Sequence, residues 1–116
     1  MPASMTDPPP LPIDRPEALE RIGGDEAFLN ELLGLYDEEY ASKSADLAAA
    51  IEAGDTDRIR SLGHGLKGSS ANLSLSRLRE AAWAMEKAGQ EKDLEAARTV
   101  LRRLEEEYRA LKAYLG

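Results

Sequence analysis

Residues 93–116 read DLEAARTVLRRLEEEYRALKAYLG, and their apolar side chains recur at alternating spacings of three and four. An α-helix completes one turn every 3.6 residues, so this spacing aligns these side chains along one side of a helix. Such a stripe is typical of a helix that packs in a bundle. It comprises Leu94, Ala97, Leu101, Leu104, Tyr108, Leu111 and Leu115. The stretch predicts a long amphipathic C-terminal helix and favours an all-α fold.

Turn signals divide the preceding sequence into further helical segments. A short helix is expected from Asp14 to the glycine pair at 23–24, followed by a long helix that Asp25 caps and that ends near residue 53. A third helix is expected from residue 55 or 56 to about 72, and a fourth from 75 to about 88, where Gly89 ends it. Long helices joined by short turns predict an antiparallel up-down-up-down four-helix bundle with a short additional N-terminal helix.

Proline marks the expected domain boundary. Five of the six prolines fall within the first twelve residues, and the sixth is Pro16. Because proline is excluded from helix interiors, residues 1–12 are predicted to form a flexible Pro-rich leader and residues 13–116 the bundle domain.

The composition excludes several classes of function. The 116 residues contain no cysteine, so disulfides and thiolate metal sites are excluded. The net charge of −7 disfavours binding to nucleic acid or anionic lipid. No segment approaches the roughly 20 apolar residues that span a membrane, and no signal peptide is recognisable. We expect a cytoplasmic monomer that binds neither nucleic acid nor membrane.

Residues 64–74, HGLKGSSANLS, contain the single histidine of the chain. On a helical wheel Lys67, Gly68 and Ala71 share the face of His64, whereas the leucines of this segment lie on the opposite side. The imidazole is therefore predicted to point to solvent. Gly68 lies one turn ahead on the same face, and the glycines at 63 and 65 are expected to thin the flanks of the ring so that another macromolecule can reach it.

The residues around His64 limit the kinds of reaction in which it can take part. One histidine without cysteine cannot form a usual zinc site. Ser69 and Ser70 project toward the core side, so a serine–histidine couple is excluded on this helix. What remains is the imidazole as a nucleophile, because its ordinary pKa near 6.5 leaves much of it neutral. Lys67 adds a point charge suited to a phosphoryl group or a carboxylate.

The motif resembles the signature of histidine-containing phosphotransfer (HPt) domains, and the likeness extends from about Ile13 to Leu115. The resemblance implies that His64 accepts a phosphoryl group from an aspartyl phosphate on a receiver domain and passes it to another receiver. Lys67 would then offset charge on the phosphoryl oxygens, and Gly68 would leave space for the receiver. It also implies a carrier without autonomous kinase activity or a cofactor of its own, with Mg²⁺ bound by the receiver.

Two further positions are interpreted through the same resemblance. Family members often place Gln or Glu beside the imidazole, and Glu86 is the candidate here, with Gln90 as a substitute. An ordinary exposed glutamate is the alternative for Glu86. The family commonly has glycine where this chain has Ser74, so that turn is expected to be built differently, with serine available to cap the next helix.

Helix 25–53 carries a second apolar stripe formed by Phe28, Leu32 and Leu35. The short first helix could cover it through Leu19 and Ile22, or part of it could stay exposed near His64 as a docking patch. Trp83 is either a rim contact or a partly buried anchor. The predicted partner-binding residues are Ile22, Phe28, Leu32, Gly65 and Ala71.

Two alternatives to a phosphoryl carrier remain at this point. The first is a non-catalytic helical adaptor that binds receiver domains, although an adaptor has no need of the imidazole. The second is the phosphoacceptor domain of a chemotaxis-type kinase, which would need an ATP-binding domain outside this sequence.

Overall fold

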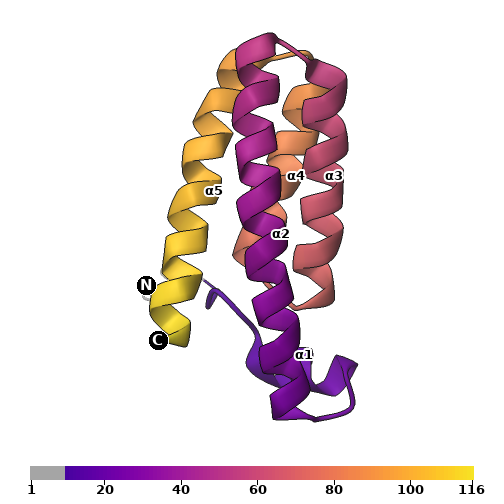
Figure 1. The fold of residues 1–116 in the computed structure, drawn as a ribbon, viewed down its shortest axis with the longest axis vertical. Coiled ribbons are helices and arrows are strands. Elements are labelled where there is room, and N and C mark those ends of the chain that lie inside the picture. The colour runs from indigo at the N-terminus through magenta and orange to yellow at the C-terminus, as the bar shows by residue number, and fades with distance from the viewer. Residues whose placement is uncertain (1–9) are drawn as a thin grey trace, which may run out of the picture.

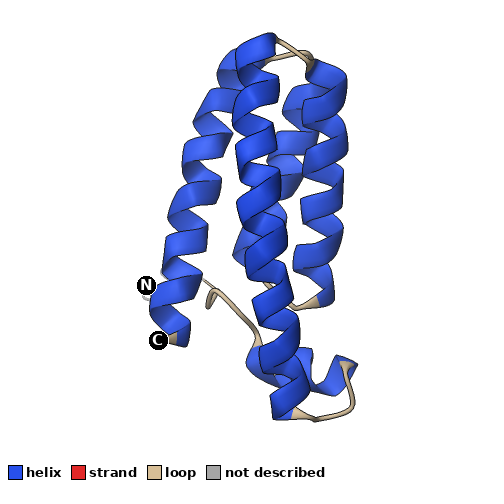
Figure 2. Ribbon diagram, in the orientation of Figure 1, coloured by secondary structure: helices blue, strands red, loops and turns tan. Residues whose placement is uncertain are grey.

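A computed structural model describes residues 10–116, and within this range all regular structure is α-helical (Figure 2). The predicted all-α class is confirmed. The helices are α1 (Arg15–Arg21), α2 (Glu26–Ala53), α3 (Thr56–Asn72), α4 (Ser76–Gln90) and α5 (Leu94–Leu115).

The four long helices run alternately up and down (Figure 1). Each packs against its neighbour in sequence, and α5 closes the ring by packing against α2. The N-terminal part of α2 extends beyond the end of α3, and α1 lies beside this extension (Figure 1). The arrangement is the predicted antiparallel bundle with a short additional helix.

Aspartate begins four of the five helices. Asp14, Asp25, Asp55 and Asp93 precede α1, α2, α3 and α5, and each side chain accepts a hydrogen bond from the backbone N–H three residues later. Such a cap satisfies a backbone donor that has no partner within the helix. The caps explain why the predicted starts of these helices agree closely with the structure.

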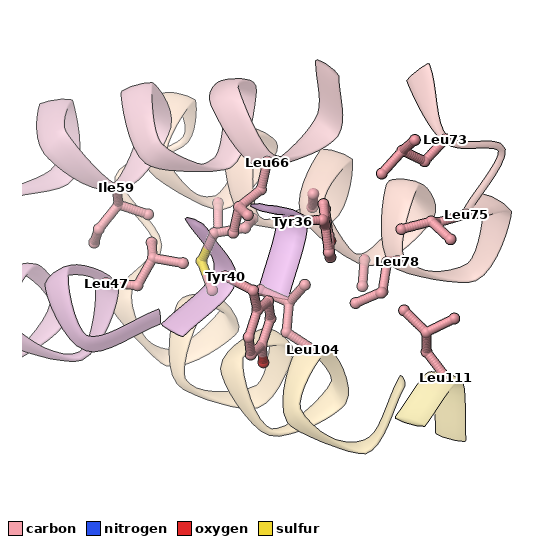
Figure 3. Close-up of a cluster of buried hydrophobic side chains, with 14 of the residues drawn as sticks. Tyr36, Tyr40, Leu47, Ile59, Leu66, Leu73, Leu75, Leu78, Leu104 and Leu111 are labelled. Atoms are coloured by element: carbon pink, nitrogen blue, oxygen red, sulfur yellow. The ribbon is translucent and has the colours of Figure 1, made fainter. Parts of the chain in front are cut away.

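The core lies between the four long helices and is built mainly from leucine and alanine, together with isoleucine, tyrosine and Met85 (Figure 3). The apolar stripe of α3 supplies Ile59 and Leu66, and both are fully buried. Tyr40 of α2 stacks on Tyr108 of α5 with ring centroids 3.9 Å apart. The hydroxyls of Tyr36 and Ser70 form a buried hydrogen bond of 2.8 Å between α2 and α3. The α3 stripe is thus directed inward, which fixes the direction of its opposite face.

Two glycines have roles that differ from the predicted ones. Gly89 does not end α4, which continues to Gln90; a Cβ at Gly89 would clash with the backbone of Arg60. A Cβ at Gly63 would lie 2.6 Å from the backbone nitrogen of Glu86. Both glycines therefore allow α3 and α4 to pack backbone to backbone. For Gly63 the expected role in opening the flank of the ring is wrong, because the residue is buried under α4.

The turn between α3 and α4 contains Ser74 in the left-handed region, with φ of 57°. The serine hydroxyl donates a 2.7 Å hydrogen bond to Glu17 of α1, and the Asp14 N–H donates to the Ser74 carbonyl. The expectation that serine caps α4 is wrong, since Leu75 occupies the cap position without a side-chain bond. The turn keeps the backbone shape that glycine adopts easily, and a side-chain contact supports it.

The predicted leader lies mostly outside the described residues, because residues 1–9 are not described. Of its remaining part, Pro12 is buried and the adjacent Ile13 is fully enclosed in the core.

Candidate functional site

His64 lies in the middle of α3 on the face turned away from the core, and its side chain is 67% exposed. The fully buried Ile59 and Leu66 of the same helix fix this orientation, because they occupy the opposite side of the turn. The ring is therefore open to an approaching molecule.

Glu86 of α4 contacts the side chains of both His64 and Lys67. Its Oε2 lies 3.2 Å from Nδ1 of His64, and its Oε1 lies 2.7 Å from Nζ of Lys67. The Glu86 side chain is only 12% exposed. The contact with Lys67 lowers the pKa of Glu86, burial opposes this, and the hydrogen bond with His64 adds to the lowering. The carboxylate is thus ionised and can accept a hydrogen bond from Nδ1 of His64. In the tautomer that donates this bond, Nε2 carries the lone pair.

Gln90, the predicted substitute, is exposed at the C-terminal end of α4. Within residues 10–116 the side chain that accepts a hydrogen bond from the His64 ring is Glu86. The alternative of an ordinary exposed glutamate does not fit the enclosed position of Glu86.

Gly68 and Gly65 have different surroundings. A Cβ at Gly68 would meet no atom within 4 Å, so the surface beside the ring is open there. A Cβ at Gly65 would lie 2.6 Å from Nζ of Lys43, which extends from α2. Gly65 is therefore partly covered by a lysine ammonium, whereas Gly68 leaves free space.

Lys43 belongs to a polar cluster between α2 and α3. Its Nζ donates to Oε2 of Glu39 at 2.7 Å, and the Ser69 hydroxyl donates to the same oxygen at 2.6 Å. Burial raises the pKa of Glu39, but the hydrogen bonds from Lys43 and Ser69 outweigh this and lower it. Two lysines that are each paired with a carboxylate therefore lie near His64, Lys67 on α3 itself and Lys43 on α2.

A shallow pocket of about 220 Å³ lies next to His64 on the surface of α3 and α4. Its lining consists of Lys67, Gly68, Ala71, Arg79 and Trp83. Trp83 is 48% exposed, and Nζ of Lys87 lies 5.1 Å from the centroid of its ring. The pocket combines an apolar side chain with positive charge, although the protein as a whole is acidic. Ala71 thus shares this surface with Lys67, as its place on the helical wheel predicts.

The predicted partner residues of the N-terminal region lie elsewhere. Ile22 and Leu32 are partly buried against the core, whereas Phe28 is exposed. Along α2, Phe28 precedes Lys43 by fifteen residues, which corresponds to about 22 Å of helix. The α2 part of the expected patch is therefore not close to the imidazole, because α2 extends beyond the end of α3 (Figure 1).

Sequence reasoning missed Arg79, Glu39 and Lys43 near the site. The spacing of Glu39 and Lys43, four residues apart, was a usable signal for an ion pair on one helix face. Nothing in the sequence of α2 indicates that this pair lies against Gly65, because that depends on the register between α2 and α3.

No group of three or more His, Cys, Asp or Glu side chains in residues 10–116 is placed to hold a metal ion. Over the same range, every helix is too short or too polar to cross a lipid bilayer.

Comparison with known proteins supplies the family. The chain is 42% identical over 65 residues to multistep phosphorelay regulator 1 of Schizosaccharomyces pombe (strain 972 / ATCC 24843). The aligned region covers 55% of this chain and 22% of that protein, so the chain spans about a fifth of the length of this curated relative. No solved structure matches.

A family model of the Hpt domain matches residues 31–114, well over half of the chain. This range contains His64, Lys67, Gly68 and Glu86, and it covers α3, α4 and most of α2 and α5. Hpt domains act in phosphorelays as phosphotransfer intermediates rather than kinases, and they generally interact with receiver domains. The chain belongs to the Hpt domain family.

Proposed function

We propose that this protein carries a phosphoryl group on Nε2 of His64, accepting it from the aspartyl phosphate of one receiver domain and passing it to the aspartate of another. One observation carries the proposal: the ring is largely exposed, while its Nδ1 is held 3.2 Å from Glu86. A ring held in this way presents the lone pair of Nε2 outward.

In the proposed transfer the Nε2 lone pair forms the new N–P bond as the P–O bond to the receiver aspartate breaks. The electron pair of the broken bond leaves on the aspartate carboxylate. Glu86 accepts the Nδ1 hydrogen bond and stabilises the positive charge that develops on the ring, and Lys67 offsets charge on the phosphoryl oxygens. The receiver supplies the Mg²⁺ for the reaction. This chain orients the imidazole and supplies at least one cation, the ammonium of Lys67.

We propose the pocket beside His64 as the part of the docking surface nearest the reaction. Its positive charges suit the acidic metal-binding carboxylates of a receiver active site, and Trp83 offers apolar contact area. Gly68 lines this pocket one helical turn after His64, where a longer side chain would block the approach. We predict that this encounter occurs in the cytoplasm and that the protein takes part in it as a monomer.

The test mixes the protein with a phosphorylated receiver domain and Mg²⁺ and follows the labelled phosphate. We expect an acid-labile, alkali-stable phosphate on the wild type and none on His64→Gln. Tight receiver binding without movement of label would contradict the carrier and identify an adaptor instead.

A further inference from the structure

A second lysine lies close to His64, and it comes from a different helix than Lys67. The Nζ of Lys43 lies 2.6 Å from the position that a Cβ on Gly65 would occupy. Gly65 directly follows His64, and adjacent Cα atoms are about 3.8 Å apart, so this ammonium lies within roughly 8 Å of the Cα of His64. An imidazole that carries a phosphoryl group extends over a similar distance.

The two lysines approach the histidine from opposite flanks. Successive residues of a helix are rotated by about 100°, which places Gly65 on one side of His64 and Lys67 roughly 60° away on the other. Lys67 lies on the α4 side, where it pairs with Glu86, and Lys43 lies on the α2 side, where it pairs with Glu39.

The pairing of Lys43 allows its ammonium to move. Glu39 Oε2 accepts hydrogen bonds from both Lys43 and Ser69, at 2.7 and 2.6 Å. If Lys43 turns toward an anion above Gly65, the carboxylate keeps the bond from Ser69 and is not left without a partner. The side chain of Lys43 is 29% exposed, so it is not enclosed in the core.

We propose that Lys43 is a second phosphoryl-binding cation of this site, which stabilises the phosphoryl group on His64 from the side opposite Lys67. The inference rests on the proposed function of His64. Gly65 is part of the arrangement, because any larger residue there would occupy the space that the ammonium uses. Consider two negative charges on a phosphoryl group that lies about 8 Å from an ammonium in water. Their attraction is strong enough to change the rate constant of labelling about fivefold, and salt screens it.

The experiment uses phosphoramidate, a small phosphoryl donor that needs no receiver. The Nε2 lone pair forms the N–P bond, the P–N bond of the donor breaks, and the electron pair leaves with ammonia. The rate constant of labelling is measured by intact mass at about 0.02 M and about 0.5 M salt. The variants are Lys43→Met, Lys43→Arg and His64→Gln. Lys112→Met is the matched control, because Lys112 also pairs with an α2 carboxylate, Asp37, at 3.2 Å.

We expect Lys43→Met to lower the rate constant about fivefold at low salt and less than about twofold at high salt. Lys43→Arg should restore most of the rate, and Lys112→Met should match the wild type. Equal low-salt labelling of Lys43→Met and the wild type would overturn the proposal. An equal loss in Lys112→Met would also overturn it, because net charge rather than position would then be the cause.

Gly65→Ala tests the geometry independently. Its Cβ would contact only the flexible end of Lys43, so the helix keeps its fold while the ammonium is displaced. We expect the same low-salt loss as in Lys43→Met, and no further loss when the two substitutions are combined. An additive loss would contradict the shared mechanism. Failure of the proposed function has a different signature: the wild type would take no label from a phosphorylated receiver, whatever phosphoramidate does.

Discussion

Replacing Gly63 by alanine should destabilise the protein, although alanine is the better helix former. The new Cβ would lie 2.6 Å from the Glu86 backbone nitrogen and 3.1 Å from the Ala82 carbonyl oxygen. These are backbone atoms of α4 and cannot rotate away. Ordinary contact begins at 3.4 Å, so α3 and α4 must separate locally by about 0.8 Å.

The magnitude follows from two opposing effects. Forcing an extra methyl into a packed contact costs about 1–3 kcal/mol, whereas glycine to alanine in a helix gains up to about 1 kcal/mol. We expect Gly63→Ala to lower the free energy of unfolding by up to about 2 kcal/mol. Gly68→Ala in the same helix meets no atom within 4 Å, so it should raise this free energy by about 0.5–1 kcal/mol. The melting temperatures should shift by roughly 4 °C per kcal/mol, in opposite directions.

The assay is urea denaturation of Gly63→Ala and Gly68→Ala, with unfolding monitored by circular dichroism. A second readout is phosphoryl transfer from a receiver, because separation of α3 from α4 carries Glu86 away from the ring that it contacts at 3.2 Å. Gly63→Ala should therefore lose transfer rate as well as stability. If Gly63→Ala is stabilised as much as Gly68→Ala, the close packing of the two backbones is refuted.

Three further predictions concern the site and the core. Gly68→Gln should block transfer from a receiver but leave labelling by phosphoramidate and the helical circular dichroism nearly unchanged; full receiver transfer would contradict the role of open space. The pKa of Glu86 is lowered on folding, so its contribution to stability is present above its ordinary value of 4.5 and is lost as the pH falls through the folded pKa. When the free energy of unfolding is measured as the pH is lowered, Glu86→Gln should lose less stability than the wild type. An identical dependence on pH in the two proteins would refute this. Tyr36→Phe should cost about 1–3 kcal/mol in chemical denaturation by leaving the buried Ser70 hydroxyl without its bond. Tyr40→Phe should be nearly neutral, since within residues 10–116 this hydroxyl has no partner and burial raises its pKa to about 12; a larger cost at Tyr40 than at Tyr36 would overturn the comparison.

Local signals in the sequence predicted the helices well. The apolar stripe beginning at Leu94 and the capping aspartates Asp25 and Asp55 each depend on neighbours within a few residues, so their meaning does not require the partner helix. The outward direction of His64 could be predicted for the same reason. Helical periodicity alone separates it from Ile59 and Leu66, which are buried.

The glycines of α3 and α4 show what a sequence does not contain. Gly63, Gly65, Gly68 and Gly89 are chemically identical, yet two touch the backbone of a neighbouring helix, one lies under a lysine and one faces open space. Which role applies depends on the distance and register between helices, and these follow from the packing of many side chains together. The proximity of Lys43 to His64 was hidden in the same way, since the residues are 21 positions apart and meet only through α2–α3 packing.

The tie between Ser74 and α1 has a consequence for anyone who transplants this module into another protein. The family match begins at residue 31, but Glu17 supports the Ser74 turn and Ile13 fills the core from before that point. A graft cut at the family boundary would discard these supports and leave the loop at the end of α3 poorly anchored. The smallest transferable unit therefore starts no later than Pro12.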